Sequence, residues 1–156
     1  MMNDLKAKEI MTVDVKTVKK DDTVSDVAKL LIQDKIGGLP VVDEDNKVIG
    51  IISETDILKK EKYIEPPRVI NFLQGLIFLD DMKNLEKDLK RIAAYKVEDL
   101  MTEDIVTVHE DDKFDDVANV MIKKSINRVP VVDDDGKIKG IICRYDIIKS
   151  LYGDKQ

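Results

Sequence analysis

Apolar and polar residues follow one pattern twice along this 156-residue chain. Residues 9–59 and 99–149 align without a gap at an offset of 90, and 24 of the 51 aligned positions are identical. The run Pro40–Asp43 returns unchanged as Pro130–Asp133. Self-similarity over such a length defines the organisation of a chain before any single element does. We therefore interpret the chain as two homologous repeats.

Each repeat is predicted to begin with a short strand, because apolar and polar residues alternate at Val15–Val18 and at Ile105–Val108. The aspartate pairs at 21–22 and 111–112 are then expected to cap a helix and to place negative charge at its N-terminus.

The helix that follows is amphipathic, with apolar residues spaced i, i+3, i+4, i+7 and i+8 on one face. These residues are Val24, Val27, Ala28, Leu31 and Ile32 in the first repeat and Phe114, Val117, Ala118, Met121 and Ile122 in the second. We expect Gly37-Gly38 and Asn127 to end the two helices.

A hairpin comes next, with strands predicted at 39–42 and 48–52, and again at 129–132 and 138–142. Its acidic connection is expected to be a solvated turn rather than a cation site. A second short helix starts at Thr55 or Tyr145. The predicted fold class is α+β, with two pseudo-symmetric β-α-β-β-α repeats packed sheet to sheet, since about fifty residues bury too little core alone.

The predicted domains are repeat 1 at 7–60, a helical insert or linker at 61–96, and repeat 2 at 97–152. Within the insert, Pro66-Pro67 interrupts any helix, Val69–Leu79 is apolar, and Met82–Ala94 reads as a helix. That helix is expected to dock on its own domain, and the apolar segment offers a self-association surface as the alternative.

Composition narrows the function. The net charge of −6 and the pI near 4.9 disfavour general nucleic-acid binding, because an acidic surface repels phosphates. One cysteine and no apolar leader or membrane-length segment lead us to expect a soluble, cytoplasmic protein with no membrane partner.

Catalytic chemistry finds little support in the sequence. His109 is the only histidine and is expected in a solvated loop, while Cys143 is expected to be small and half-buried. No P-loop, metal-ligand spacing or catalytic triad is recognisable, so we expect neither an enzyme nor a metal site.

One polar arrangement does recur, at Gly50–Asp56 and Gly140–Asp146, where a strand runs into a helix that carries an aspartate in its first turn. An ordinary helix cap explains this aspartate by itself. The alternative is that the carboxylate accepts both hydroxyls of a ribose and that the helix N-terminus suits phosphate.

Together with Met11-Thr12, Thr17-Val18, Met101-Thr102 and Thr107-Val108, this doubled pattern resembles the CBS-domain pair, or Bateman module. The resemblance covers the chain except residues 60–96. It leaves no catalytic domain over, and therefore implies the stand-alone form of the module.

The resemblance implies two adenosine sites, each combining the Gly-to-Asp segment of one repeat with the first strand of the other. The first would comprise Ile51, Ser53, Thr55, Asp56, Thr102, Ile105, Val106 and Ile126. The second would comprise Thr12, Val15, Lys16, Ile36, Arg128, Ile141, Cys143, Tyr145 and Asp146. By the same resemblance, the aspartate holds the ribose, the hydroxyls reach sugar or phosphate, and backbone of the opposite strand reads the adenine.

The two sites differ in their polar groups. Gly37-Gly38 stands where family members often carry a basic residue for phosphate, whereas Arg128 provides that charge in the second site. Cys143 and Tyr145 replace the hydroxyl-bearing residues of the second site. We predict unequal affinities, with the better ribose end in the first site and the better charge in the second.

The function implied is a regulatory sensor whose ligand is AMP, ADP or ATP, with S-adenosylmethionine and cyclic di-AMP as related ligands and no further cofactor. A homodimer and an unidentified protein partner are expected. The alternatives are a ligand-free structural or protein-interaction module and, least supported, an enzyme acting on a nucleotide.

Overall fold

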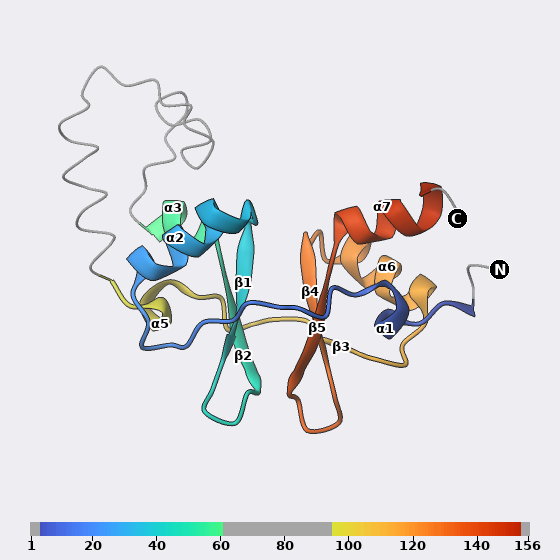
Figure 1. Cartoon of the computed structure of the whole chain (residues 1–156), viewed down its shortest axis with the longest axis horizontal. Helices are drawn as coiled ribbons and strands as arrows, with labels where there is room; N and C mark the ends of the chain where they lie inside the picture. Colours follow the sequence, from blue (N-terminus) through green and yellow to red (C-terminus); the bar gives the residue numbers. More distant parts are fainter. Residues whose placement is uncertain (1–3, 61–94, 154–156) are drawn as a thin grey trace, which may run out of the picture. The chain divides into compact units, whose positions relative to one another are not determined.

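The computed structural model describes residues 4–60 and 95–153, so the predictions for Pro66-Pro67, Val69–Leu79 and Met82–Ala94 lie outside the described residues (Figure 1). The elements are, in chain order, α1 (Ala7–Ile10), α2 (Val24–Asp34), β1 (Gly38–Val42), β2 (Val48–Ser53), α3 (Glu54–Lys60), α5 (Val97–Leu100), β3 (Val108–His109), α6 (Phe114–Lys123), β4 (Arg128–Val132), β5 (Ile138–Cys143) and α7 (Arg144–Tyr152). The α+β class is confirmed, and both repeats share the order helix, strand, strand, helix, but within the described part of the chain the strand predicted to open each repeat is present only in the second, as β3.

The hairpins form as predicted, and the first strand of each repeat is shorter than predicted. β4 pairs antiparallel with β5, and β3 pairs parallel with β4 through Val108 and Val131. Among the described residues of the first repeat, only Val18 makes a parallel bridge, to Val41. The alternation of apolar and polar residues predicted longer strands at Val15–Val18 and Ile105–Val108. Such alternation indicates which face of a segment is apolar, but it does not determine how many of its backbone groups pair with a neighbouring strand.

The helix ends correct two expectations. Asp22 and Asp112 do not cap helices; each accepts a hydrogen bond of 2.8 Å from a backbone N–H three residues earlier and so closes the preceding turn. Thr23 caps α2 instead, through the amide of Asp26. The left-handed residue that ends α2 is Lys35, rather than one of the two glycines.

The amphipathic helices bury the predicted face only in part. Val24, Val27 and Leu31 of α2 are buried, as are their counterparts in α6. The last position of each stripe is open, with Ile32 59% and Ile122 75% exposed. The apolar stripe is therefore wider than the surface that the strands cover.

The hairpin turns are closed by their first aspartate. Asp43 Oδ1 accepts backbone hydrogen bonds of 2.9 Å from Asp45 and Lys47, and Asp133 does the same in the second repeat. The N–H of Lys137 and then that of Asp135 lower the pKa of Asp133, because both stabilise the ionised carboxylate. This geometry supports the hairpin-turn interpretation of the acidic runs.

Two compact units emerge, and each takes its first short helix from the other repeat. The α7 unit comprises the described residues of the ranges Met1–Lys16, Val42–Val48 and Asp104–Gln156, and the α2 unit comprises those of Thr17–Val41 and Ile49–Glu103. Each has its own buried aliphatic cluster. The sequence division at 7–60, 61–96 and 97–152 stays a prediction about repeats, because the compact units group the residues differently.

Backbone hydrogen bonds attach each of these helices. In the α7 unit, Ala7 N donates to Asp112 O at 2.8 Å and Phe114 N donates to Leu5 O at 2.8 Å. In the α2 unit, the corresponding bonds run from Val97 N to Asp22 O and from Val24 N to Tyr95 O, both at 2.8 Å. Within the α7 unit, α1 contacts both α7 and β5.

Candidate functional site

The glycine that opens each recurring Gly-to-Asp segment lets a Met-Thr segment lie against the strand. A Cβ on Gly140 would meet the Met11 sulfur and lie 2.9 Å from the Thr12 carbonyl oxygen; one on Gly50 would lie 2.9 Å from the Thr102 carbonyl oxygen. Thr12 and Thr102 each exchange two backbone hydrogen bonds with an isoleucine of the strand, Ile141 and Ile51 respectively. The close approach therefore places a threonine beside each aspartate-bearing helix.

In the α2 unit, both carboxylate oxygens of Asp56 are occupied. Oδ2 accepts from Ser53 N at 2.9 Å and from Ser53 Oγ at 3.1 Å, and the Ser53 hydroxyl accepts from Asp56 N at 3.3 Å. Oδ1 accepts from Thr102 Oγ1 at 2.8 Å. Asp56 thus caps α3 and also binds a threonine that is 46 residues away.

In the α7 unit, the equivalent aspartate is engaged on one side only. Asp146 Oδ2 accepts from Cys143 N at 2.7 Å and completes a capping box at the start of α7. Among the described residues, no side chain donates to Oδ1 of Asp146, although Thr12 lines the same pocket. This leaves a half-buried carboxylate oxygen available to a ligand hydroxyl.

Cys143 is half-buried, as expected. Burial raises the pKa of its thiol, the charge of Asp146 raises it further, and the nearby Arg128 guanidinium lowers it. Arg128 is the register partner of Cys143 on β4. A thiol with a raised pKa is a poor nucleophile near neutral pH, consistent with a packing role.

A polar pocket of about 350 Å³ opens beside Asp146 in the α7 unit. It lies between α1, the residues that follow it, and α7. The lining residues are Glu9, Ile10, Met11, Thr12, Asp146, Lys149 and Ser150. Ser150 Oγ donates to the Asp146 carbonyl at 2.8 Å, so that its lone pairs remain available to a donor.

The structure brings together part of each predicted site. Of the first site, the α2 unit contains Ile51, Ser53, Thr55, Asp56 and Thr102, whereas Ile105, Val106 and Ile126 belong to the α7 unit. Of the second site, the α7 unit contains Thr12, Val15, Lys16, Arg128, Ile141, Cys143, Tyr145 and Asp146, whereas Ile36 belongs to the α2 unit. Ligand binding by these residues remains a prediction.

Five pocket residues were not among the predicted sites: the apolar Ile10 and Met11 and the polar Glu9, Lys149 and Ser150. Lys149 and Ser150 follow Asp146 at i+3 and i+4, so helical spacing was a signal that could have found them. Glu9 had no such signal, because it reaches the pocket only through the attachment of α1 to the second repeat.

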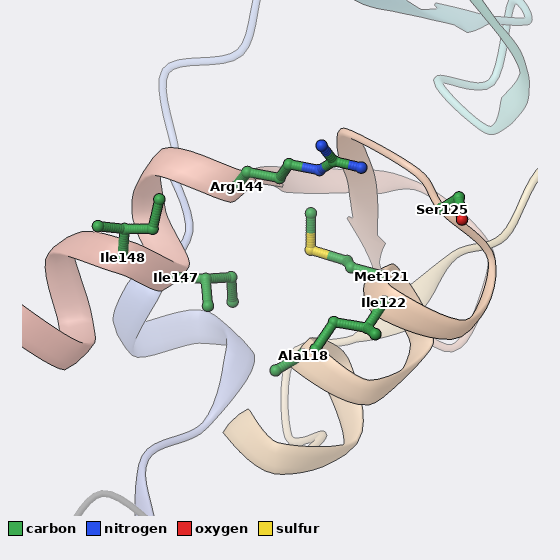
Figure 2. A pocket seen from close by; sticks show the side chains of 7 residues that line it. All are labelled: Ala118, Met121, Ile122, Ser125, Arg144, Ile147 and Ile148. Carbon is green, nitrogen blue, oxygen red and sulfur yellow. The ribbon is translucent and has the colours of Figure 1, made fainter.

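An apolar groove of about 330 Å³ lies elsewhere on the α7 unit, between α6 and α7 (Figure 2). The residues that line it are Ala118, Met121, Ile122, Ser125, Arg144, Ile147 and Ile148. Figure 2 shows Ile147 and Ile148 extending from α7 and Ala118, Met121 and Ile122 from α6. Ile122 and Ile148 are 75% and 56% exposed, so this face leaves large aliphatic side chains in water.

Other chemistry is sparse in the part of the chain that the structure describes. Residues 4–60 and 95–153 contain no group of three or more histidine, cysteine or carboxylate side chains placed to hold a metal ion. Over the same residues, every helix is too short or too polar to cross a bilayer. His109 is exposed, as expected, but it is the last residue of β3 rather than part of a loop.

Comparison with known proteins identifies the repeats. The sequence model of the CBS domain matches residues 7–63 and 97–153. The protein MJ1426 of Methanocaldococcus jannaschii is 35% identical over 141 residues, which cover 86% of this chain and 84% of that protein. The match to chloroplastic CBSX1 of Arabidopsis thaliana is 32% identical and covers 88% of this chain but only 59% of that protein.

Two solved structures of similar fold contain ligands. CBSX2 in complex with AMP is 26% identical, with a TM-score of 0.71 over 94% of this chain and 95% of that one. The CBS domain pair of MJ0100 in complex with 5′-methylthioadenosine and S-adenosyl-L-methionine is 30% identical, with a TM-score of 0.69 over 97% and 98% of the two chains.

Proposed function

Because this chain belongs to the CBS-domain family and carries two CBS domains in tandem, we propose that it is a regulatory module that binds an adenosine-type ligand. The main support is the doubled Thr–Asp arrangement, Thr102 with Asp56 and Thr12 with Asp146. The ligands of CBSX2 and of the MJ0100 pair, AMP and two other adenosine compounds, support the ligand class. No catalytic role is proposed.

In this proposal each aspartate accepts the hydroxyls of a ribose. The two sites then differ in how available the carboxylate is to a ligand, because Oδ1 of Asp146 accepts no side-chain hydrogen bond among the described residues, while Oδ1 of Asp56 accepts one from the Thr102 hydroxyl. A ligand at Asp56 must displace or share that bond, which costs part of its binding free energy. We infer that the Asp146 site binds ribose more readily, whereas the sequence favoured Asp56 for this role.

Signalling follows from differential binding. A ligand that prefers one arrangement of the module shifts the population towards it, and a protein partner that reads this arrangement responds. The ligand is proposed to come from AMP, ADP, ATP, S-adenosylmethionine or cyclic di-AMP.

Thermal unfolding of the purified protein with each of these five compounds tests the proposal. A ligand at a hundred times its dissociation constant adds about 2.7 kcal/mol to the free energy of unfolding. We expect an increase in melting temperature with at least one compound and a smaller increase in Asp146→Asn. If none of the five compounds raises the melting temperature, the sensor proposal is wrong.

The apolar groove between α6 and α7 favours a second candidate, a protein-interaction module that forms a homodimer through this face. Exposed aliphatic side chains that line a groove are typical of an interaction surface. Light scattering of the purified protein tests it: a mass of twice 17.8 kDa is expected, and a monomer at all concentrations would exclude the homodimer.

A further inference from the structure

The polar pocket beside Asp146 combines opposite charges, and we infer from it which adenosine ligand the module takes. The inference rests on the proposed function. We propose that this pocket binds the zwitterionic amino-acid group of an adenosyl amino acid, so that S-adenosylmethionine is preferred over nucleoside phosphates.

The first step is the charge of the pocket. Its charged lining residues are two carboxylates, Glu9 and Asp146, and one ammonium group, Lys149, so that the lining is net negative. Arg128, which the sequence offered as a phosphate partner in the second site, does not line this pocket. A phosphate group here would therefore bring further negative charge next to two carboxylates, which is unfavourable at short range. An amino-acid group has one charge of each sign, and S-adenosylmethionine as a whole carries a net positive charge.

The second step is the availability of the groups. Among the described residues, Lys149 makes no ion pair or side-chain hydrogen bond, so its ammonium group can meet a ligand carboxylate. Glu9 uses Oε2 to accept from Lys6 N at 2.7 Å and leaves Oε1 for a ligand ammonium group. Ser150 has lone pairs available for the same ammonium group, because its hydroxyl donates elsewhere.

The third step is position. Asp146 shares this pocket, and it is the residue proposed to hold the ribose hydroxyls. In S-adenosylmethionine the amino-acid chain is attached at the 5′ carbon of that ribose. Because Glu9 and Lys149 line the same pocket as Asp146, we place the 5′ substituent of a ribose held by Asp146 beside these two charges. 5′-Methylthioadenosine has the same nucleoside without the amino-acid group and is the natural comparison.

The test is titration calorimetry of the full chain with S-adenosylmethionine, 5′-methylthioadenosine and AMP. Lys149→Met is expected to weaken S-adenosylmethionine binding about fivefold, the upper range for an exposed ion pair, and to leave 5′-methylthioadenosine unchanged. Glu9→Gln is expected to weaken S-adenosylmethionine binding and to strengthen AMP binding. A purely structural role of Glu9 would move both affinities in the same direction.

Lys59→Met is the matched control, because Lys59 occupies the equivalent position of the first repeat and its substitution removes the same charge. Equal losses of S-adenosylmethionine affinity in Lys59→Met and Lys149→Met would overturn the assignment to this pocket. If Lys149→Met weakens 5′-methylthioadenosine as much as S-adenosylmethionine, the amino-acid inference is wrong while the adenosine sensor stands. If no adenosine compound binds the parent protein, both proposals are wrong.

Discussion

The hydrogen bonds of the two repeat aspartates predict that Asp56→Ala destabilises the protein more than Asp146→Ala. The carboxylate of Asp56 accepts three hydrogen bonds, two from Ser53 and one from Thr102, whereas the carboxylate of Asp146 accepts one, from Cys143 N. The two positions are related by the repeat, so each variant serves as the control for the other.

The magnitudes follow from these partners. Loss of the helix cap costs about 1 kcal/mol at either position. The hydroxyl–carboxylate bond from Thr102 adds about 1 kcal/mol at Asp56 alone, the value of an ordinary hydrogen bond rather than of one to a buried charge, because Thr102 is exposed. Asp56→Ala should therefore lower the free energy of unfolding by about 2 kcal/mol, roughly 4–8 °C in melting temperature for a chain of this length, and Asp146→Ala by about half.

Urea unfolding followed by circular dichroism measures both values without ligand. Thr102→Val should reproduce the additional loss of Asp56→Ala, and the double variant should lose less than the sum of the two single variants, because they share one hydrogen bond. Thr12→Val should have little effect, since Thr12 makes no side-chain hydrogen bond among the described residues. Equal destabilisation by Asp56→Ala and Asp146→Ala would refute the asymmetry.

Three further predictions concern packing, association and ionisation. Gly140→Ala should destabilise by about 1–3 kcal/mol, and by more than Gly50→Ala, because its Cβ would come within 2.7 Å of Met11 Cγ, whereas a Cβ on Gly50 would stay 3.2 Å from the Met101 sulfur and both would lie 2.9 Å from a threonine carbonyl oxygen; equal melting temperatures of the two variants would contradict this. Ile122→Glu should leave the melting temperature nearly unchanged and convert a dimer to a monomer in light scattering, and a variant that stays dimeric would exclude the groove as the interface. The pKa of the Cys143 thiol is raised on folding. The contribution of this thiol to the free energy of unfolding is therefore complete below the unfolded pKa of about 8.5 and is lost as the pH rises through the folded pKa. Between these two pKa values Cys143→Ala should lose less stability than the parent protein, and parallel plots of stability against pH would contradict this prediction.

The asymmetry also affects how ligand binding is measured. Asp56→Ala removes the carboxylate half of the capping interaction between Ser53 and Asp56 together with the proposed ribose contact, so a loss of binding in that variant has two causes. Asp56→Asn keeps an oxygen that can accept from Ser53 N and an amide that can donate to the Thr102 hydroxyl. The asparagine variants are therefore better reporters of the carboxylate's role.

Much of the local structure was predictable from the sequence. The hairpin strands, the amphipathic helices and the starts of α3 and α7 follow from apolar periodicity, which reflects backbone hydrogen bonding between near neighbours and burial of one face. The caps were predicted less well: Asp22 closes a turn and Thr23 caps α2, because neighbouring polar residues compete for the same amides and the backbone geometry selects between them.

The residues that make up the two sites show which features a local sequence pattern can predict and which it cannot. The sequence by itself established two repeats, the hairpins, and an aspartate in the first turn of each closing helix. Only the tertiary structure decided that α1 packs on the second repeat, which places Glu9 in the same pocket as Lys149. It also decided that Thr102 fills one side of Asp56 while the equivalent oxygen of Asp146 stays open. The physical reason is that these partners lie 46 to 140 residues apart, so backbone pairing and core packing across the repeats choose them rather than any pattern in adjacent residues.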